Sequence, residues 1–254
     1  MSITRSISLL APATDRPMWR EFGLLLIGHG SEHSDGPNQQ LIRQVDHLRG
    51  LGVFADVQGA VLYGEPTLQS AMKALGDRPV HVMPMFMCDG LFTREIIPAR
   101  IDELQDDCRD ITFETPIGLS DALGELIARR VSSRIAEDGF LETEVSVVLV
   151  GHGSTASDAS WRATEHQAER LRILANLKSV TTAYLDQPPK LADVLAGLSG
   201  PVCVVGLFIA DGLHAGGDIP AIIAQSGKAG DICYLGAIGR DPEIVELVVG
   251  ELEG

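Results

Sequence analysis

Short apolar runs bounded by Gly or Pro alternate along the chain with longer segments in which apolar residues recur three and four positions apart. Short continuous apolar runs are typical of buried β-strands, and the wider spacing is typical of amphipathic helices. The pattern predicts strands over residues 23–28, 54–62, 80–87, 111–115, 145–150, 180–185, 202–208 and 232–235. It predicts helices over residues 39–48, 66–75, 94–106, 120–136, 159–177, 189–198, 219–225 and 242–252.

Each half of the chain is therefore predicted to hold four strands that alternate with four helices. Strands that alternate with helices form parallel sheets, in which right-handed crossovers place helices on both faces. We expect an α/β protein with two parallel four-stranded sheets. Pro84 lies inside one predicted strand and has no backbone N–H to donate, so we expect it at a strand end or at an irregularity in the strand.

The chain contains one motif twice. Residues 25–31 read Leu-Leu-Ile-Gly-His-Gly-Ser, and residues 148–154, 123 positions later, read Val-Leu-Val-Gly-His-Gly-Ser. An apolar segment that ends in Asp-Gly-Leu at Leu91 returns with the same ending at Leu213, an offset of 122 positions. The sequences Pro-Ile-Gly and Ala-Ile-Gly also repeat, at an offset of 121 positions. A nearly constant offset indicates a duplicated domain.

The duplication divides the chain into an N-terminal extension over residues 1–22, a first half over residues 23–138 and a second half over residues 139–254. A chain of 254 residues with 45% hydrophobic content is long enough for two cores, each built from about 125 residues. Since no linker rich in Pro or Gly separates the halves, we predict that the hinge is the helix from Ser120 and the acidic stretch over residues 137–144.

Composition excludes several classes of function. The formal net charge of −15, from 20 Lys plus Arg and 35 Asp plus Glu, argues against binding to nucleic acid or to anionic membranes. Four scattered cysteines lack the paired spacing of a structural zinc site or a disulfide framework. No apolar run approaches the roughly 20 residues that span a bilayer, and none reaches secretory length near the N-terminus. We therefore expect a soluble cytoplasmic protein with reduced thiols.

Three side chains of the second half can meet at one edge of its sheet. His152, Asp186 and His214 each follow a predicted strand, and the carboxyl ends of parallel strands share one edge. Two imidazoles and one carboxylate suit a divalent metal such as Fe(II) or Co(II), with coordination positions left open. The same groups can accept protons near neutral pH. A lone histidine at a strand end is more often a hydrogen-bonding residue, but the duplication of the motif favours a functional role.

Two other interpretations of the glycine motif fit less well. The sequence over residues 151–156 matches a G-x-G-x-x-A dinucleotide fingerprint, but no acidic residue ends a strand at the required distance of about 20 residues, and a histidine between the glycines serves no pyrophosphate. The nucleophile turn of esterases requires G-x-S-x-G, which neither copy contains. We expect no organic cofactor.

The two Gly-His-Gly-Ser copies, residues 84–91 and the Gly-Leu-His-x-x-x-Asp-Ile-Pro segment at residues 212–220 resemble the class II chelatases of the CbiX type. Those enzymes insert cobalt or iron into sirohydrochlorin. The resemblance covers essentially all of the chain after residue 22. It implies two flavodoxin-like lobes that enclose one tetrapyrrole cleft, in which two histidines and a carboxylate hold the metal and accept the pyrrole protons.

Carried over residue by residue, the resemblance makes His152 and His214 the metal ligands and Asp186 the catalytic carboxylate, where the family more usually has Glu. All three lie in the second half. The resemblance therefore implies that the second half carries out the chemistry.

The first half departs from the family pattern. His29 matches, but Phe92 stands at the position of the second histidine, and Tyr63 or Glu65 stands near that of the carboxylate. An aromatic ring at residue 92 can lie against a tetrapyrrole. We therefore expect His29 and Phe92 to contact substrate rather than metal.

Sirohydrochlorin carries many carboxylates, so an acidic protein needs local cations at the mouth of the cleft. Arg94, Arg162 and Lys190 lie just past the relevant strand ends. We assign Arg94 to substrate binding, together with Ser154, which ends the second Gly-His-Gly-Ser.

Taken together, these expectations describe a chelatase that inserts a divalent metal, Co²⁺ or Fe²⁺, into a small-molecule tetrapyrrole for cobalamin or siroheme biosynthesis. The metal is then a substrate rather than a resident cofactor. The alternative function is a carrier that binds a tetrapyrrole or a metal but does not catalyse insertion.

Overall fold

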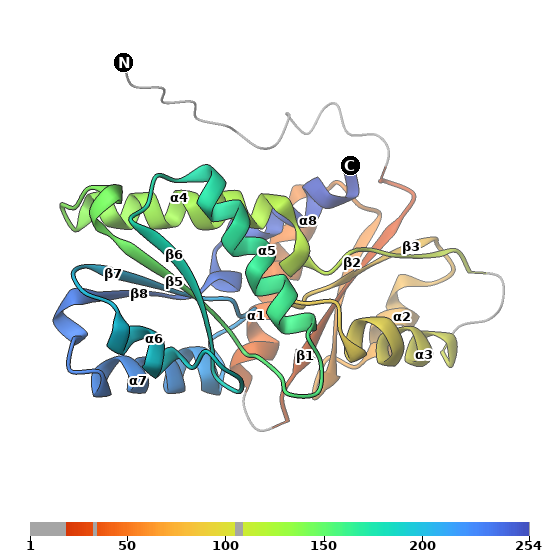
Figure 1. Cartoon of the computed structure of the whole chain (residues 1–254). Helices are drawn as coiled ribbons and strands as arrows, with labels where there is room; N and C mark the ends of the chain where they lie inside the picture. The colour runs from red at the N-terminus through yellow and green to blue at the C-terminus, as the bar shows by residue number, and fades with distance from the viewer. Residues whose placement is uncertain (1–18, 33–34, 105–108, 254) are drawn as a thin grey trace, which may run out of the picture.

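The computed structural model describes residues 19–32, 35–104 and 109–253. Within them, two parallel four-stranded sheets lie next to each other, each with helices packed against it (Figure 1). The strand orders are β2-β1-β3-β4 and β6-β5-β7-β8, which are the same order in the two halves. The predicted α/β fold with two parallel four-stranded sheets is confirmed.

The first half contains β1 (Gly23–Gly30), α1 (Asp35–Leu51), β2 (Asp56–Tyr63), α2 (Leu68–Leu75), β3 (Val80–Pro84), α3 (Ile97–Asp102), β4 (Ile111–Phe113) and α4 (Asp121–Glu137). The second half contains β5 (Ser146–Gly151), α5 (Ala159–Leu174), β6 (Ser179–Tyr184), α6 (Leu191–Gly197), β7 (Val202–Gly206), α7 (Ile219–Gln225), β8 (Ile232–Ala237) and α8 (Ile244–Glu253).

Several boundaries differ by a few residues from those that the sequence predicts, and two of the differences have a clear physical cause. Strand β3 ends at Pro84, three residues before the predicted end at residue 87. Proline has no backbone N–H, so it cannot donate a hydrogen bond to a neighbouring strand. The helix predicted over residues 94–106 begins instead as a π-helical turn at Phe92–Ile96 and continues as α3 to Asp102. Residues 105 and 106 of that prediction lie outside the described residues.

The end of the predicted N-terminal extension packs on the first half. Trp19 lies edge-on to the ring of His81, with ring centroids 4.8 Å apart, and also contacts Phe22. Residues 1–18 of the extension lie outside the described residues.

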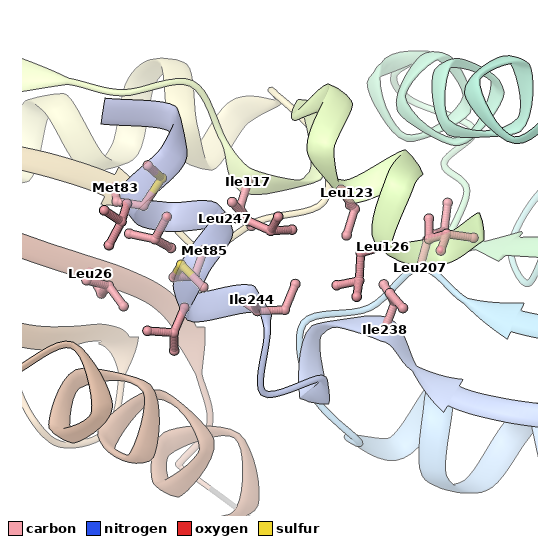
Figure 2. Packing of buried hydrophobic residues seen from close by; sticks show 14 of the residues in the cluster. Leu26, Met83, Met85, Ile117, Leu123, Leu126, Leu207, Ile238, Ile244 and Leu247 are labelled. Atoms are coloured by element: carbon pink, nitrogen blue, oxygen red, sulfur yellow. The ribbon is translucent and has the colours of Figure 1, made fainter. Parts of the chain in front are cut away.

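The last helix of each half packs against the sheet of the other half. Helix α4 lies over the second sheet, where Leu126 is beside Ile238 (Figure 2). Helix α8 lies over the first sheet, where Ile244 and Leu247 are beside Met85 (Figure 2). The halves therefore exchange their terminal helices.

This exchange corrects two expectations. The sequence predicts one core for each half, but the largest cluster of buried side chains runs continuously through both halves, and a smaller one lies on the outer face of each sheet. The helix that begins after Ser120 is predicted as part of a hinge, whereas α4 buries Leu123, Leu126 and Ile127 in that shared core. Apolar spacing identifies the buried face of a helix but not the sheet that covers it.

Two buried glutamines join the halves in a reciprocal way. Gln44 on α1 donates from Nε2 to the carbonyl oxygen of Gly239 at 3.1 Å. Gln167 on α5, 123 positions later, donates from Nε2 to the carbonyl oxygen of Gly118 at 2.9 Å. Each glutamine thus donates to the equivalent loop of the opposite half. The two halves are therefore related by an approximate twofold axis.

The two accepting glycines explain why Ile-Gly is repeated. A Cβ on Gly118 would lie 2.2 Å from Cα of Met87, and a Cβ on Gly239 would lie 2.4 Å from Cα of Ile209. Only glycine allows these backbones to approach so closely. The close contact holds the loop after the third strand of each sheet against the loop after the fourth strand of the same sheet, whose glycine carbonyl accepts the hydrogen bond from the other half.

Replacing Gly239 with alanine is therefore expected to lower the free energy of unfolding by about 2–3 kcal/mol, because backbone must move to admit the methyl group. Gly250, in α8, is the matched control, since no atom lies within 4 Å of an added Cβ. Gly250→Ala should stabilise the protein by about 0.5–1 kcal/mol. Urea unfolding followed by circular dichroism measures both. Equal stabilities for the two variants would contradict the steric argument.

A charged contact adds to the link between the halves. The Arg130 guanidinium on α4 donates two hydrogen bonds to the Asp241 carboxylate and one to Glu243. Partial burial alone raises the pKa of Asp241, but the hydrogen bonds from Arg130 and from the backbone N–H of Glu243 outweigh it, and the pKa lies below its ordinary value.

Because the pKa of Asp241 is lowered by folding, this contact stabilises the protein above the ordinary aspartate pKa of about 3.9 and is lost as pH falls through the folded value. Asp241→Asn should lower the free energy of unfolding by about 1–2 kcal/mol at pH 7. The difference from the unsubstituted protein should shrink below about pH 4. Urea titrations between pH 7 and pH 3 test this, and a difference independent of pH would refute it.

Candidate functional site

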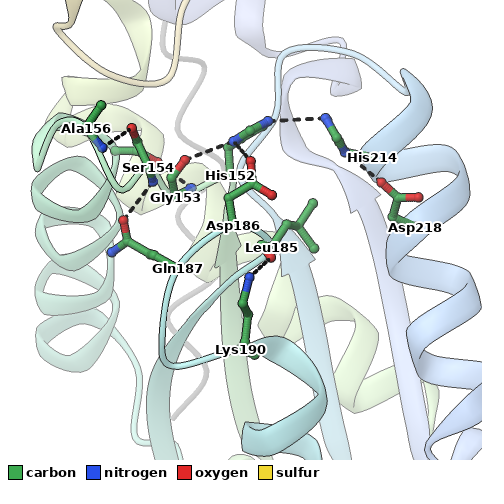
Figure 3. Close-up of polar contacts among 11 residues, drawn as sticks. His152, Gly153, Ser154, Ala156, Leu185, Asp186, Gln187, Lys190, His214 and Asp218 are labelled. Atoms are coloured by element: carbon green, nitrogen blue, oxygen red, sulfur yellow. Dashed lines mark hydrogen bonds and ion pairs between the residues drawn. The ribbon is translucent and has the colours of Figure 1, made fainter.

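Glycines shape the turn that carries His152 out of the second sheet. Strand β5 ends at Gly151, where a Cβ would lie 2.3 Å from Oγ1 of Thr164. Gly153 has φ of +80°, a conformation that favours glycine. The chain therefore reverses directly after His152, whose side chain points away from the end of β5 (Figure 3).

A π-helical turn carries His214. The loop after β7 ends at Leu213, and residues His214–Asp218 form the wider turn before α7. In this turn Nδ1 of His214 lies 2.7 Å from Oδ2 of Asp218. Single π-turns occur frequently at functional sites. The first half has the same turn at Phe92–Ile96.

The two imidazoles meet through the same ring atom. Nε2 of His152 lies 3.2 Å from Nε2 of His214, and the rings are nearly perpendicular at 89° (Figure 3). For an ion about 2.1 Å from both nitrogens, the N–ion–N angle would be roughly 100°, which is normal in tetrahedral and octahedral complexes. Within the described residues, no group of three or more His, Cys, Asp or Glu side chains is arranged to hold a metal. The pair therefore offers two nitrogen ligands and leaves the other coordination positions open.

Carboxylates occupy the opposite side of each imidazole. Oδ2 of Asp186 lies 3.3 Å from Nδ1 of His152, and Asp218 contacts Nδ1 of His214 (Figure 3). The Gly153 carbonyl oxygen also lies 2.9 Å from Nδ1 of His152. Carboxylates that accept from Nδ1–H orient an imidazole and leave Nε2 as the ligand atom.

This geometry changes what the sequence implies about Asp186. The structure brings it to His152 as predicted, but on the Nδ1 side, so it is not beside the paired Nε2 atoms. Asp218 has the corresponding position at His214, and the sequence reasoning assigned it no role. Its spacing of four residues from His214 is the signal that could have identified it, because residues four apart lie on one face of a helical turn.

The other predicted residues of the second half hold the loops in place. The Ser154 backbone N–H donates to Oε1 of Gln187 at 2.7 Å, and its hydroxyl accepts from the N–H of Ala156 (Figure 3). Lys190 donates from Nζ to the Leu185 carbonyl oxygen, directly before Asp186 (Figure 3). Both side chains therefore have structural partners beside the histidines.

The first half repeats this arrangement with aromatic rings. His29 and Phe92 are nearly perpendicular at 86°, with ring centroids 4.9 Å apart, so Phe92 takes the place of His214. The ring centroid of Tyr63, at the repeat position of Asp186, lies 5.0 Å from that of His29. Glu65 instead accepts from the backbone N–H of Thr67. Of the two candidates for the carboxylate position, Tyr63 is thus the one that contacts His29.

A cavity of about 520 Å³ lies where the two halves meet at this end of the molecule. Its lining comes from both halves and consists of Asp89, Gly90, Leu91, Arg94, Glu95, Leu119, Ser157, Asp158, Ala159, Arg162 and Ala163.

Two predicted cations line this cavity. Arg94 donates from Nε to Asp89 at 2.8 Å, and Arg162 donates from Nε to Asp158 at 2.7 Å. In the described part of the chain, the Nη groups of both arginines have no hydrogen-bond partner. Each guanidinium is therefore anchored at Nε and can offer its outer nitrogens to an anion.

The CbiX family model matches residues 23–134 and residues 146–253, which make up nearly all of both halves. The chain belongs to the CbiX family. The probable sirohydrochlorin cobaltochelatase of Halobacterium salinarum is 27% identical over 260 residues, with 89% of each chain covered. Each of the two matched ranges contains one copy of Gly-His-Gly-Ser.

Two solved chelatase structures share the fold. CbiX, described as the terminal enzyme for biosynthesis of siroheme in denitrifying bacteria, superposes with a TM-score of 0.74 at 22% identity, covering 91% of this chain and 98% of that one. The sirohydrochlorin chelatase SirB from Bacillus subtilis, solved in complex with cobalt, has a TM-score of 0.74 at 18% identity, covering 92% of this chain and 94% of that one.

No helix among the described residues is long and apolar enough to cross a bilayer.

Proposed function

We propose that this protein inserts Co(II) or Fe(II) into sirohydrochlorin, with metal and tetrapyrrole both as substrates. The observation that carries the proposal is the pair of Nε2 atoms of His152 and His214, 3.2 Å apart at the carboxyl edge of the second sheet. Membership of the CbiX family and the cobaltochelatase relative support the same reaction.

The paired histidines are suited to hold a metal only loosely. An ion bound through two neutral nitrogens keeps positions open for the nitrogens of the macrocycle, so it can be handed over without leaving a closed cage. The reaction exchanges one divalent ion for two pyrrole protons. As the ion leaves His152 and His214, their Nε2 atoms become free to accept those protons.

Asp186 and Asp218 complete this proton balance. Each contacts Nδ1 of one histidine, so its negative charge compensates the positive charge of an imidazole that has taken a proton at Nε2. Neither carboxylate needs to touch the metal. We assign both as positioning residues.

The first half supplies the opposite wall of the site. We propose that Phe92 and His29 lie against the macrocycle and that Arg94 binds one of its peripheral carboxylates. Ser154 belongs to the rim beside His152. The anchored guanidinium of Arg94 and the paired rings of the first half support these assignments.

Two further predictions belong to the same proposal. The boundary between the halves, near residues 138 and 139, is supported by the separate matches of the family model to each half. A cytoplasmic location is supported by the thiols of Cys88, Cys203 and Cys233, which are free.

Replacing His152 or His214 with alanine should slow metal insertion by about 10²–10³-fold, because each variant loses a ligand and a proton acceptor. The double variant should be little worse than either single variant, since the two side chains act as a unit. The rate is measured from the absorption change of sirohydrochlorin with Co(II), above the rate without protein. His47→Ala, at an exposed position of α1, is the control.

Near wild-type turnover in the double variant would rule out this site. Binding of sirohydrochlorin by the unsubstituted protein without acceleration of metal insertion would instead favour the carrier function.

Asp186→Asn and Asp218→Asn should each reduce the insertion rate by about 10-fold or more, as expected for partners of ligand histidines.

The two halves should respond differently to the same substitution. His29→Ala should reduce insertion by less than about 10-fold, because Phe92 leaves His29 without a second imidazole. Co(II) soaked into crystals should give density between His152 and His214 and none at His29. Metal bound at His29, or a larger loss for His29→Ala than for His152→Ala, would show that the halves are assigned the wrong way round.

A further inference from the structure

Two leucines at equivalent positions of the repeat project into solvent. Leu91 is 59% exposed and Leu213 is 78% exposed. They are 122 positions apart, and each precedes a π-helical turn with the same backbone angles, φ of −52° and ψ of −43°. Among the exposed large hydrophobic residues of the described ranges, they form the one pair that the repeat relates. Single exposed leucines are common, but repetition at one position in both halves requires a common cause.

The loops that carry the two leucines are held firmly. Asp89, two residues before Leu91, accepts from the Thr93 hydroxyl and from Nε of Arg94, both at 2.8 Å. In the other half, Asp211 accepts from Arg240 and from the backbone N–H of Ala237. The exposure of the leucines is therefore built into the loops, and a ligand that covers them need not first order the backbone.

Each leucine lies beside one wall of the proposed site. Leu213 directly precedes His214, and Leu91 directly precedes Phe92. Leu91 also lines the cavity between the halves, together with Arg94 and Arg162. Both sides of the site thus combine an apolar side chain with a ring, and on the Leu91 side two guanidinium groups, each anchored at Nε by an aspartate, line the cavity. This combination matches a flat apolar ring system with a rim of carboxylates.

We infer that Leu91 and Leu213, one from each half, pack on the ring system of the tetrapyrrole substrate and hold it between the two walls. This inference rests on the proposed function. It assigns substrate contact to two residues that bind no metal and transfer no proton.

The test measures binding of metal-free sirohydrochlorin by absorption and fluorescence titration. Leu91→Gln and Leu213→Gln should each weaken binding by about five- to tenfold, and the double variant by more, because apolar area is left without a partner. Leu91→Met and Leu213→Met should restore most of the affinity, since Met keeps the apolar surface. Leu141→Gln and Ile173→Gln are matched controls, at 67% and 75% exposure away from the site, and should stay within twofold.

Two readouts separate substrate contact from structural damage. Thermal unfolding and Co(II) affinity in the absence of tetrapyrrole should be unchanged in the Leu→Gln variants. If the unsubstituted protein does not bind sirohydrochlorin, the proposed function fails. If it binds and the site variants match the controls, or if only one leucine matters, the inference about the two leucines is overturned while the proposed function stands.

Discussion

The reciprocal packing of the two halves is the constraint on which the rest of this structure depends. Each half places its last helix on the sheet of the other half, and Gln44 and Gln167 donate across the boundary to loops that only glycine can form. The buried area is largely apolar, and Nε2 of each glutamine is paired across the boundary, so neither half can rotate without exposing core or breaking buried hydrogen bonds. The carboxyl edges of both sheets are held together as a result.

That fixed relation lets a duplicated fold build one asymmetric site. The loops at equivalent places retain their backbone, including the π-helical turns at Phe92 and His214. The side chains on them have diverged, so that one wall presents two imidazoles and the other presents an imidazole against a phenyl ring. A single macrocycle between the walls needs only one source of metal. The preserved ring geometry of the first half shows that this loop kept its structure, as the proposed packing against a substrate requires.

Charge is organised locally within a strongly acidic chain. Asp186 and Asp218 each face the Nδ1 atom of a histidine, whereas Arg94 and Arg162 are anchored by aspartates at the cavity between the halves. Net charge describes the whole molecule, but recognition of a ligand depends on the charged groups that line its binding site. Here the acids orient histidines and arginines instead of forming a ligand cage of their own.

The sequence by itself determined the order of strands and helices, the parallel sheets, the duplication and the meeting of His152 and His214 at one sheet edge. These follow from apolar periodicity, from the constant offset and from residues that leave strands at one edge, all of which are local or repeated signals. Tertiary structure alone decided that α4 and α8 are exchanged, because apolar spacing shows that a helix face is buried but not against which sheet. It also decided that Asp186 contacts Nδ1 rather than the metal side of His152, and that Asp218 does the same at His214. Such choices depend on side-chain directions between segments distant in sequence, and spacing along the chain does not encode them.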